Sequence, residues 1–120
     1  MDRVAAAKEA AQQFRAICLL KGAGTLITNG RQMMKNTTGN PAMASGGMGD
    51  VLTGLIAALW AQMAMQTLDT GLRAAGLGSY LHGLAADKAI KKFPERTLLA
   101  SDLIDVFPTV FKHVFKGSDR

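Results

Sequence analysis

Residues 46–50 of this 120-residue chain read Gly-Gly-Met-Gly-Asp, and an apolar run begins directly after them. Three glycines in four residues allow a tight bend and leave the backbone N–H groups uncovered by side chains. The run at 51–56 predicts a helix, so these N–H groups are expected at a helix N-terminus, where the partial positive charge of the backbone favours anions. The segment therefore predicts an anion-binding turn that opens a helix.

Asp50 is an unusual residue for a site that only holds a phosphate, since it is itself negative. It suits phosphoryl transfer, in which the carboxylate takes a proton from the acceptor hydroxyl while the amides of 46–49 hold the charge of the phosphoryl group. The alternative is a first-turn aspartate that only stabilises the helix dipole. The neighbouring glycines favour the catalytic interpretation.

A second glycine-rich segment, Lys-Gly-Ala-Gly-Thr at 21–25, follows an all-apolar run at 17–20. We predict that this run is a strand buried on both faces of a parallel sheet, and the ends of such strands are where open α/β sheets bind ligands. Gly22 and Gly24 would let the backbone approach a nucleotide, and Lys21 can offer charge to a phosphate. A glycine turn after a strand is common, so this segment alone predicts little, and Lys21 could equally be a solvated lysine.

The rest of the chain predicts short strands followed by helices. Helices are predicted at 2–14, 48–65, 69–92 and from 101 onward, and strands at 17–20, 25–28 and 31–35. Asn29-Gly30 is a strong hairpin signal between the last two strands, and the composition of 36–47 indicates a loop. Ser101 is expected to cap the last helix, and Pro108 to kink it or restart it one residue later.

Several single side chains have mainly structural interpretations. Cys18, the one cysteine, is expected to be a small buried thiol, which rules out a disulfide within the chain. The alternative for Asn40 is an Asx turn that only fixes its loop. We expect His82 to pack or cap rather than act as an acid or base, and Asp87 and Asp102 to be surface or capping residues.

Charge and composition limit the possible partners. No acidic residue lies between Glu9 and Asp50, whereas four basic residues do. The positive electrostatic field of such a segment would favour a polyphosphate ligand. An ordinary surface that is short of acidic residues explains the same charge pattern equally well. Nucleic acid fits poorly because the basic residues form no run and no aromatics are interleaved with them. The charged N-terminus is unlike a signal peptide, and no apolar stretch suits a membrane span. We therefore expect a cytoplasmic protein that contacts neither nucleic acid nor membrane.

The two glycine motifs together resemble the ribokinase-like superfamily, whose nucleotide site ends with a G-x-G-D turn that opens a helix. Within it, the segment at 21–25 and the run Thr-Gly-Asn-Pro-Ala-Met-Ala-Ser-Gly-Gly-Met-Gly-Asp-Val-Leu-Thr-Gly at 38–54 are similar to the ADP-dependent NAD(P)H-hydrate dehydratases. His-Gly-Leu-Ala-Ala-Asp at 82–87 and Leu-Ala-Ser-Asp-Leu at 99–103 also fit that branch. Ala42 departs from it, because relatives commonly have Gly there.

This resemblance runs from about residue 17 to near the end of the chain and implies an α/β fold, the C-terminal part of a ribokinase-like three-layer domain. Family members are more than twice as long, and their N-terminal half carries most of the sheet and much of the substrate pocket. Residues 1–120 would then be a single partial domain without that half. We expect such a chain to form a homo-oligomer or to depend on the missing half, because a strand edge and apolar helix faces would need cover.

The resemblance also implies an enzyme that dehydrates hydrated NADH or NADPH, with ADP (ATP in some relatives) as phosphoryl donor and Mg²⁺ bridging the donor phosphates. Phosphorylation makes the hydroxyl a good leaving group, and elimination restores the double bond of the ring. Asp50 would be catalytic and would face the substrate hydroxyl, and no metal ligand is assigned to the chain. The nucleotide-binding residues would be Lys21, Gly22, Ala23, Gly24, Thr25, Asn40, Gly46, Gly47 and Gly49.

Two alternatives stay open. One is a small-molecule kinase of the same fold, such as a sugar or hydroxymethylpyrimidine kinase, which would use Asp50 in the same way. The other is a non-catalytic remnant that binds nucleotide weakly or only assembles with partner chains. The amino-acid sequences at 21–25 and 40–45 favour the dehydratase over the kinase.

Overall fold

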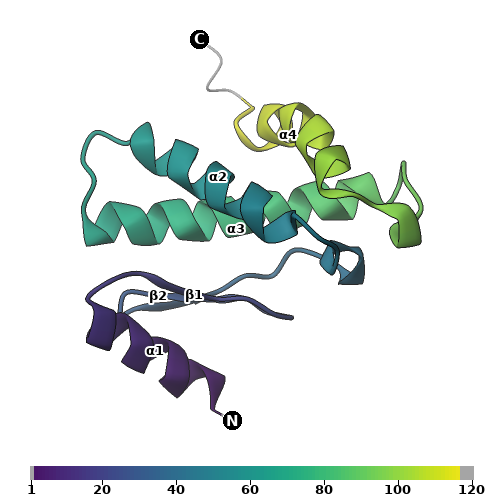
Figure 1. Cartoon of the computed structure of the whole chain (residues 1–120). Helices are drawn as coiled ribbons and strands as arrows, with labels where there is room; N and C mark the ends of the chain where they lie inside the picture. Colours follow the sequence, from purple (N-terminus) through teal and green to yellow (C-terminus); the bar gives the residue numbers. More distant parts are fainter. Residues whose placement is uncertain (1, 117–120) are drawn as a thin grey trace.

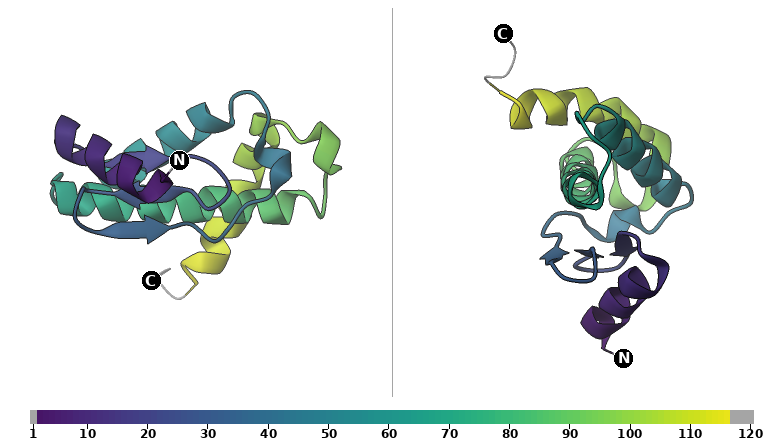
Figure 2. Two further views of the ribbon diagram at one scale, coloured as in Figure 1. Left: turned by 90° about the horizontal axis from the view of Figure 1, so that it is seen from below. Right: turned by 90° about the vertical axis from the view of Figure 1, so that its left-hand side faces the viewer.

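The computed structural model describes residues 2–116 and has three layers (Figure 1). The elements are α1 (Arg3–Phe14), β1 (Cys18–Leu20), β2 (Leu26–Thr28), β3 (Met33–Lys35), η1 (Pro41–Met43), α2 (Met48–Ala61), α3 (Leu68–Ala89), η2 (Glu95–Thr97) and α4 (Ala100–Val114). Helix α1 lies on one face of the small sheet and α3 on the other, with α2 and α4 beyond α3 (Figure 2). The predicted α/β class with short strands before a helix-rich segment is confirmed.

The sheet is antiparallel in the order β1-β2-β3, with Leu19 opposite Ile27 and Ile27 opposite Met34. The prediction of a parallel sheet with a first strand buried on both faces is therefore wrong, and β1 is only half-buried. The reason is the short turn at 21–25, because a tight connection joins antiparallel neighbours, whereas parallel strands need a crossover of a dozen or more residues. The central strand β2 is the fully buried one.

The predicted hairpin between β2 and β3 is confirmed, since the turn at Asn29 and Gly30 joins them. Asn29 Oδ1 accepts hydrogen bonds from the backbone N–H groups of Arg31 and Gln32 at 2.9 and 2.8 Å, and Gly30 has a φ of 93° that side-chain-bearing residues avoid. These local bonds fix the register of the hairpin.

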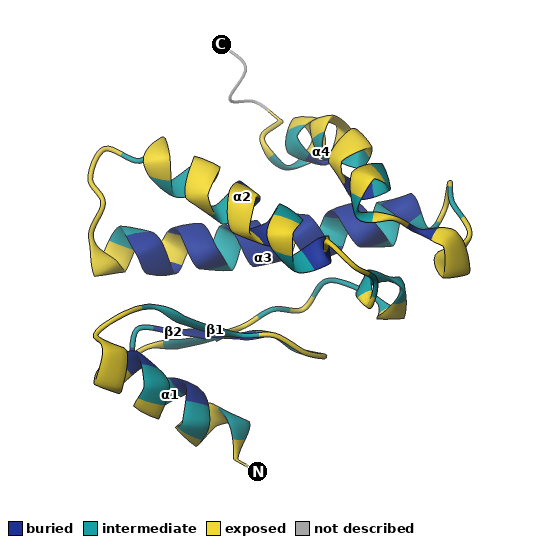
Figure 3. Cartoon of the chain, viewed as in Figure 1, coloured by how far each residue is buried: buried dark blue, intermediate teal, exposed yellow. Residues whose placement is uncertain are grey.

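Helix α3 is the centre of the helical layer and is buried along much of its length (Figure 3). Most of its buried residues are Gly, Ala or Ser. Ala74, Ala85, Ala86 and Ala89 are fully buried, so the neighbouring elements approach closely. A Cβ on Gly83, for example, would lie 2.6 and 2.8 Å from backbone atoms of the loop at 38–39. The small residues of α3 thus allow this close packing.

The ends of the helices differ from the sequence prediction. Helices α2 and α3 end at Ala61 and Ala89, a few residues earlier than the pattern indicates. Ser101 does not cap α4, because the helix already begins at Ala100 and Asp102 Oδ2 instead accepts the N–H of Leu99 at 2.9 Å. Cys18 is half-buried rather than buried.

Pro108 lies inside a continuous α4 and does not restart it. Leu103 and Val110, one on each side of the proline, are fully buried in the core with α3, and this packing holds the helix across the missing hydrogen bond. Within residues 2–116, no helix is long and apolar enough to cross a membrane.

Candidate functional site

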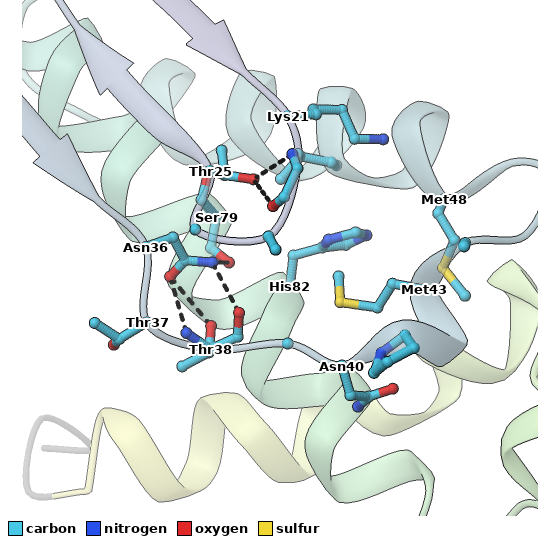
Figure 4. Close-up of a pocket in the computed structure, with 17 residues that line it drawn as sticks. Lys21, Thr25, Asn36, Thr37, Thr38, Asn40, Met43, Met48, Ser79 and His82 are labelled. Atoms are coloured by element: carbon cyan, nitrogen blue, oxygen red, sulfur yellow. Dashed lines mark hydrogen bonds between the residues drawn. The ribbon is translucent and has the colours of Figure 1, made fainter. Parts of the chain in front are cut away.

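A cavity of about 720 Å³ lies where the turn at 21–25, the loop after β3 and the helical layer meet (Figure 4). All five residues of the turn at 21–25 line it, and so does Asn40. The rest of the lining comes from the loop at 36–44 after β3, from Met48 and Leu52 of α2, and from Ser79 and His82 of α3. The fold therefore brings the first glycine motif, the middle of the second motif and α3 around one space.

The turn at 21–25 is held by its own hydroxyl and by a distant arginine. Thr25 Oγ1 accepts a hydrogen bond from the Gly22 N–H at 3.3 Å and donates one to the Gly22 carbonyl at 3.1 Å. The Arg3 guanidinium donates to the carbonyls of Leu20, Lys21 and Ala23 at 3.3, 3.2 and 3.3 Å. Arg3 was not predicted, since no local pattern connects α1 with this turn.

The second motif forms the expected helix start. Gly47 is the N-cap of α2 with a φ of 87°, and no side chain caps this end. The Met48 N–H donates to the Ser45 carbonyl at 3.5 Å, which leaves the N–H groups of Gly49 and Asp50 as the uncovered ones at this helix start. A Cβ on Gly46 would meet nothing within 4 Å. Asp50 is exposed in the first turn, and no residue between 2 and 116 donates a hydrogen bond to its carboxylate.

Lys21 connects the two motifs. Its ammonium lies 3.1 Å from the position that a Cβ on Gly49 would occupy, so the lysine of the first motif stands beside the helix start of the second. Gly46, Gly47, Gly49 and Asp50 do not themselves line the cavity, although Met48 between them does. The positive end of α2 and the Lys21 charge thus act together next to the cavity.

Asn40 fixes the loop that carries the second motif. Its Oδ1 accepts the N–H of Ala42 at 3.0 Å, and its Nδ2 donates to Asp87 Oδ1 at 2.9 Å. Asp87 Oδ2 also accepts the Gly39 N–H at 3.0 Å. These bonds support the loop-fixing interpretation of Asn40, and a contact between Asn40 and a nucleotide stays a prediction.

Asp87 is a half-buried anchor rather than the surface or capping residue that we expected. Its partners stand more than forty positions earlier in the chain, so no local pattern could reveal the role. Asn36 adds a second tie between the loop and α3, because its Nδ2 donates to the carbonyl of Ser79 at 3.1 Å.

His82 is buried, as predicted, with 2% of its surface exposed, but it also lines the cavity. Burial, and to a smaller extent the Lys21 charge, lowers the pKa of its imidazole to about 4, against the opposing effect of a hydrogen bond with the Met48 backbone. The ring is therefore uncharged at neutral pH. In Figure 4 it extends into the space between Lys21 and the methionines Met43 and Met48.

The residues present suit a nucleotide better than a metal held by side chains alone. Among residues 2–116, no three His, Cys, Asp or Glu side chains gather to hold a metal ion. Uncovered N–H groups beside a lysine fit the phosphates of a nucleotide, and Mg²⁺ in such sites is bound largely by those phosphates and by one or two carboxylates. Asp50 is an exposed carboxylate at this place.

The layer order and the glycine-flanked cavity define the class of protein, an α/β chain of the ribokinase-like fold. In agreement, the chain matches the ADP/ATP-dependent NAD(P)H-hydrate dehydratase of Bacillus subtilis, co-crystallized with ATP and Mg²⁺, with a TM-score of 0.84 and 35% identity over 93% of this chain and 39% of that one. Residues 1–109 match the family described as NAD(P)H-hydrate dehydratase, and the chain belongs to this family.

The curated relatives are named as bifunctional NAD(P)H-hydrate repair enzymes. The chain is 46% identical over 114 residues to the bifunctional NAD(P)H-hydrate repair enzyme Nnr of Moorella thermoacetica, and 50% identical over 103 residues to that of Vibrio cholerae. These matches cover 94% and 86% of this chain but only 21% and 20% of the relatives. The chain thus spans about a fifth of the length of these relatives.

Proposed function

We propose that this chain carries the nucleotide-binding part of an ADP-dependent NAD(P)H-hydrate dehydratase, and that residues 1–120 correspond to the C-terminal part of the family domain. One observation supports this most directly: the Lys21 ammonium stands beside the uncapped start of α2, next to the exposed Asp50. The family match and the solved relative with ATP and Mg²⁺ are consistent with it.

In the proposed reaction the substrate hydroxyl attacks the terminal phosphoryl group of ADP, and AMP leaves. Asp50 accepts the proton of that hydroxyl as its oxygen forms the new bond. The N–H groups at Gly47 and Gly49 and the ammonium of Lys21 stabilise the charge on the phosphoryl oxygens. Mg²⁺, when bound, neutralises charge on the donor phosphates. The phosphate then leaves the ring as the neighbouring ring carbon loses a proton, and this elimination restores the double bond of NADH or NADPH.

The kinase alternative is less favoured, because the matched family and the named relatives are hydrate dehydratases and repair enzymes. The remnant alternative remains, because the chain covers 39% of the solved relative. The expected homo-oligomer, or dependence on a segment that completes the sheet, also stays a prediction. It is supported by Leu99 and Ile104, which are 60% and 52% exposed around the start of α4. The cytoplasmic location stays a prediction as well.

The test is an assay of the chain with hydrated NADH, ADP and Mg²⁺, followed by NADH absorbance, with ADP binding measured by calorimetry. Asp50→Asn should lower turnover about a hundredfold or more, as for loss of a general base, and leave ADP affinity nearly unchanged. Asp69→Asn is the matched control, because Asp69 is an exposed first-turn aspartate of α3.

The outcomes separate the alternatives. If the chain binds ADP but forms no NADH, the non-catalytic remnant is the supported alternative. If it neither binds ADP nor forms NADH, the proposed function is wrong. A large loss of ADP affinity in Asp50→Asn would make this aspartate a structural residue. Loss of turnover in Asp69→Asn as well would show that the assay reports folding rather than catalysis.

A further inference from the structure

Two buried polar atoms on α3 face the same cavity without a partner. Ser79 Oγ and His82 Nε2 accept or donate no hydrogen bond within the described chain, and the two residues are 3% and 2% exposed. They stand three positions apart on a helix, which places them on one face, and both line the cavity. Each such atom disfavours the folded state by about 1–3 kcal/mol.

Their polar neighbours are already bonded. Asn36 Nδ2 donates to the carbonyls of Thr38 and Ser79, and Thr38 Oγ1 donates to the carbonyl of Tyr80 at 2.8 Å. Among the buried side chains that line the cavity, the atoms left without a partner are therefore Ser79 Oγ and His82 Nε2. Because buried polar groups in native proteins nearly always have partners, a bound molecule is the natural source of theirs.

The charges around the cavity are separated. Lys21 and the uncapped start of α2 meet near Gly49, which suits phosphates. The wall with Ser79 and His82 is uncharged at neutral pH, since the pKa of His82 is about 4. Met43 and Leu52 line the same cavity and offer an apolar surface to a flat ring.

We propose that Ser79 and His82 bind the uncharged nucleoside part of the nucleotide, through the hydroxyl and Nε2, while its phosphates lie toward Lys21 and Gly49. This inference rests on the proposed function and adds two binding residues that the glycine motifs do not include. It also explains why two polar atoms are retained in a wall where alanine and an apolar residue would be more stable.

The first experiment measures affinity by calorimetry, with ADP and with inorganic pyrophosphate as probes. Ser79→Ala and His82→Leu should each weaken ADP binding about three- to tenfold, the effect of one hydrogen bond, and leave pyrophosphate binding unchanged. The matched controls are Ser101→Ala and His113→Leu, which change an exposed serine and an exposed histidine of α4. An equal loss with pyrophosphate would place the phosphates against this wall and overturn the inference.

The second measurement is the thermal midpoint without ligand. Removing an unpartnered buried group should leave the midpoint of Ser79→Ala and His82→Leu unchanged or raise it. A lower midpoint together with unchanged ADP affinity would show that the two residues only support the fold, and the inference would be wrong.

The third measurement uses the unmodified chain and is independent of how the variants fold. The chain has two histidines, so the imidazole nitrogen resonances can be assigned with His113→Leu. ADP should move the Nε2 resonance of His82, and pyrophosphate should not. Turnover and ADP binding with an unmoved His82 resonance would overturn this inference alone, whereas a chain that does not bind ADP would overturn the proposed function with it.

Discussion

His82 should make the folded chain sensitive to acid. Burial, and to a smaller extent the Lys21 charge, lowers the pKa of its imidazole from the ordinary 6.5 to about 4, against the opposing effect of the Met48 backbone. In the unfolded chain the ring takes up a proton at higher pH than in the folded chain. Acid therefore favours the unfolded state, and the stability present above pH 6.5 is lost as the pH falls toward 4.

The size of this loss follows from the two pKa values. Proton linkage for a group that titrates at 6.5 when unfolded and at about 4 when folded lowers the free energy of unfolding by about 2 kcal/mol at pH 5 and about 3 kcal/mol at pH 4. Since small domains are stable by only about 5–15 kcal/mol, the effect is large enough to measure.

The assay is urea unfolding followed by circular dichroism at pH 7, 5 and 4. Carboxylates titrate in the same range, so the informative quantity is the difference in pH dependence between the unmodified chain and His82→Leu. This variant should lose about 3 kcal/mol less between pH 7 and pH 4, and His113→Leu should behave like the unmodified chain. Equal acid sensitivity in all three proteins would refute the reasoning from burial and Lys21.

Two further predictions concern the loop after β3. Gly83→Ala should lower the free energy of unfolding in urea by about 1–3 kcal/mol, because its Cβ would lie 2.6 Å from the carbonyl carbon of Thr38. Gly54→Ala is the control, because a Cβ there meets nothing within 4 Å. This control should raise the free energy of unfolding by up to about 1 kcal/mol. Asp87→Ala should speed amide hydrogen exchange at Gly39, whose N–H loses its acceptor; unchanged exchange there would contradict the anchoring role.

Local signals predicted much of this fold. The hairpin at Asn29-Gly30 and the helix that starts after Gly47 follow from residues within a few positions of each other, and the structure has both. The strand direction could not be obtained in this way, because an apolar run at 17–20 is equally compatible with either pairing. The short turn after it decided the outcome.

Only the backbone segments of the candidate site could be predicted from the sequence, and not the side chains that complete it. The glycine motifs indicated the turn at 21–25 and the start of α2, which lie side by side through Lys21 and Gly49. The side chains that complete the cavity come from the middle of α3, where Ser79 and His82 look like ordinary residues of a small-residue helix. Their importance depends on burial, which arises when the hairpin packs onto α3.

The cavity has one wall from the turn at 21–25, beside the sheet, and another from helices α2 and α3. Binding in the cavity is therefore coupled to the packing of the sheet onto the helices. Any motion that lifts β2 from α3 removes one wall while each secondary-structure element stays intact. By mass action, a molecule that touches both walls favours the joined arrangement over the parted one. A bound nucleotide would thus hold the N-terminal part of the chain, with α1 and the sheet, against the helices α2 and α3.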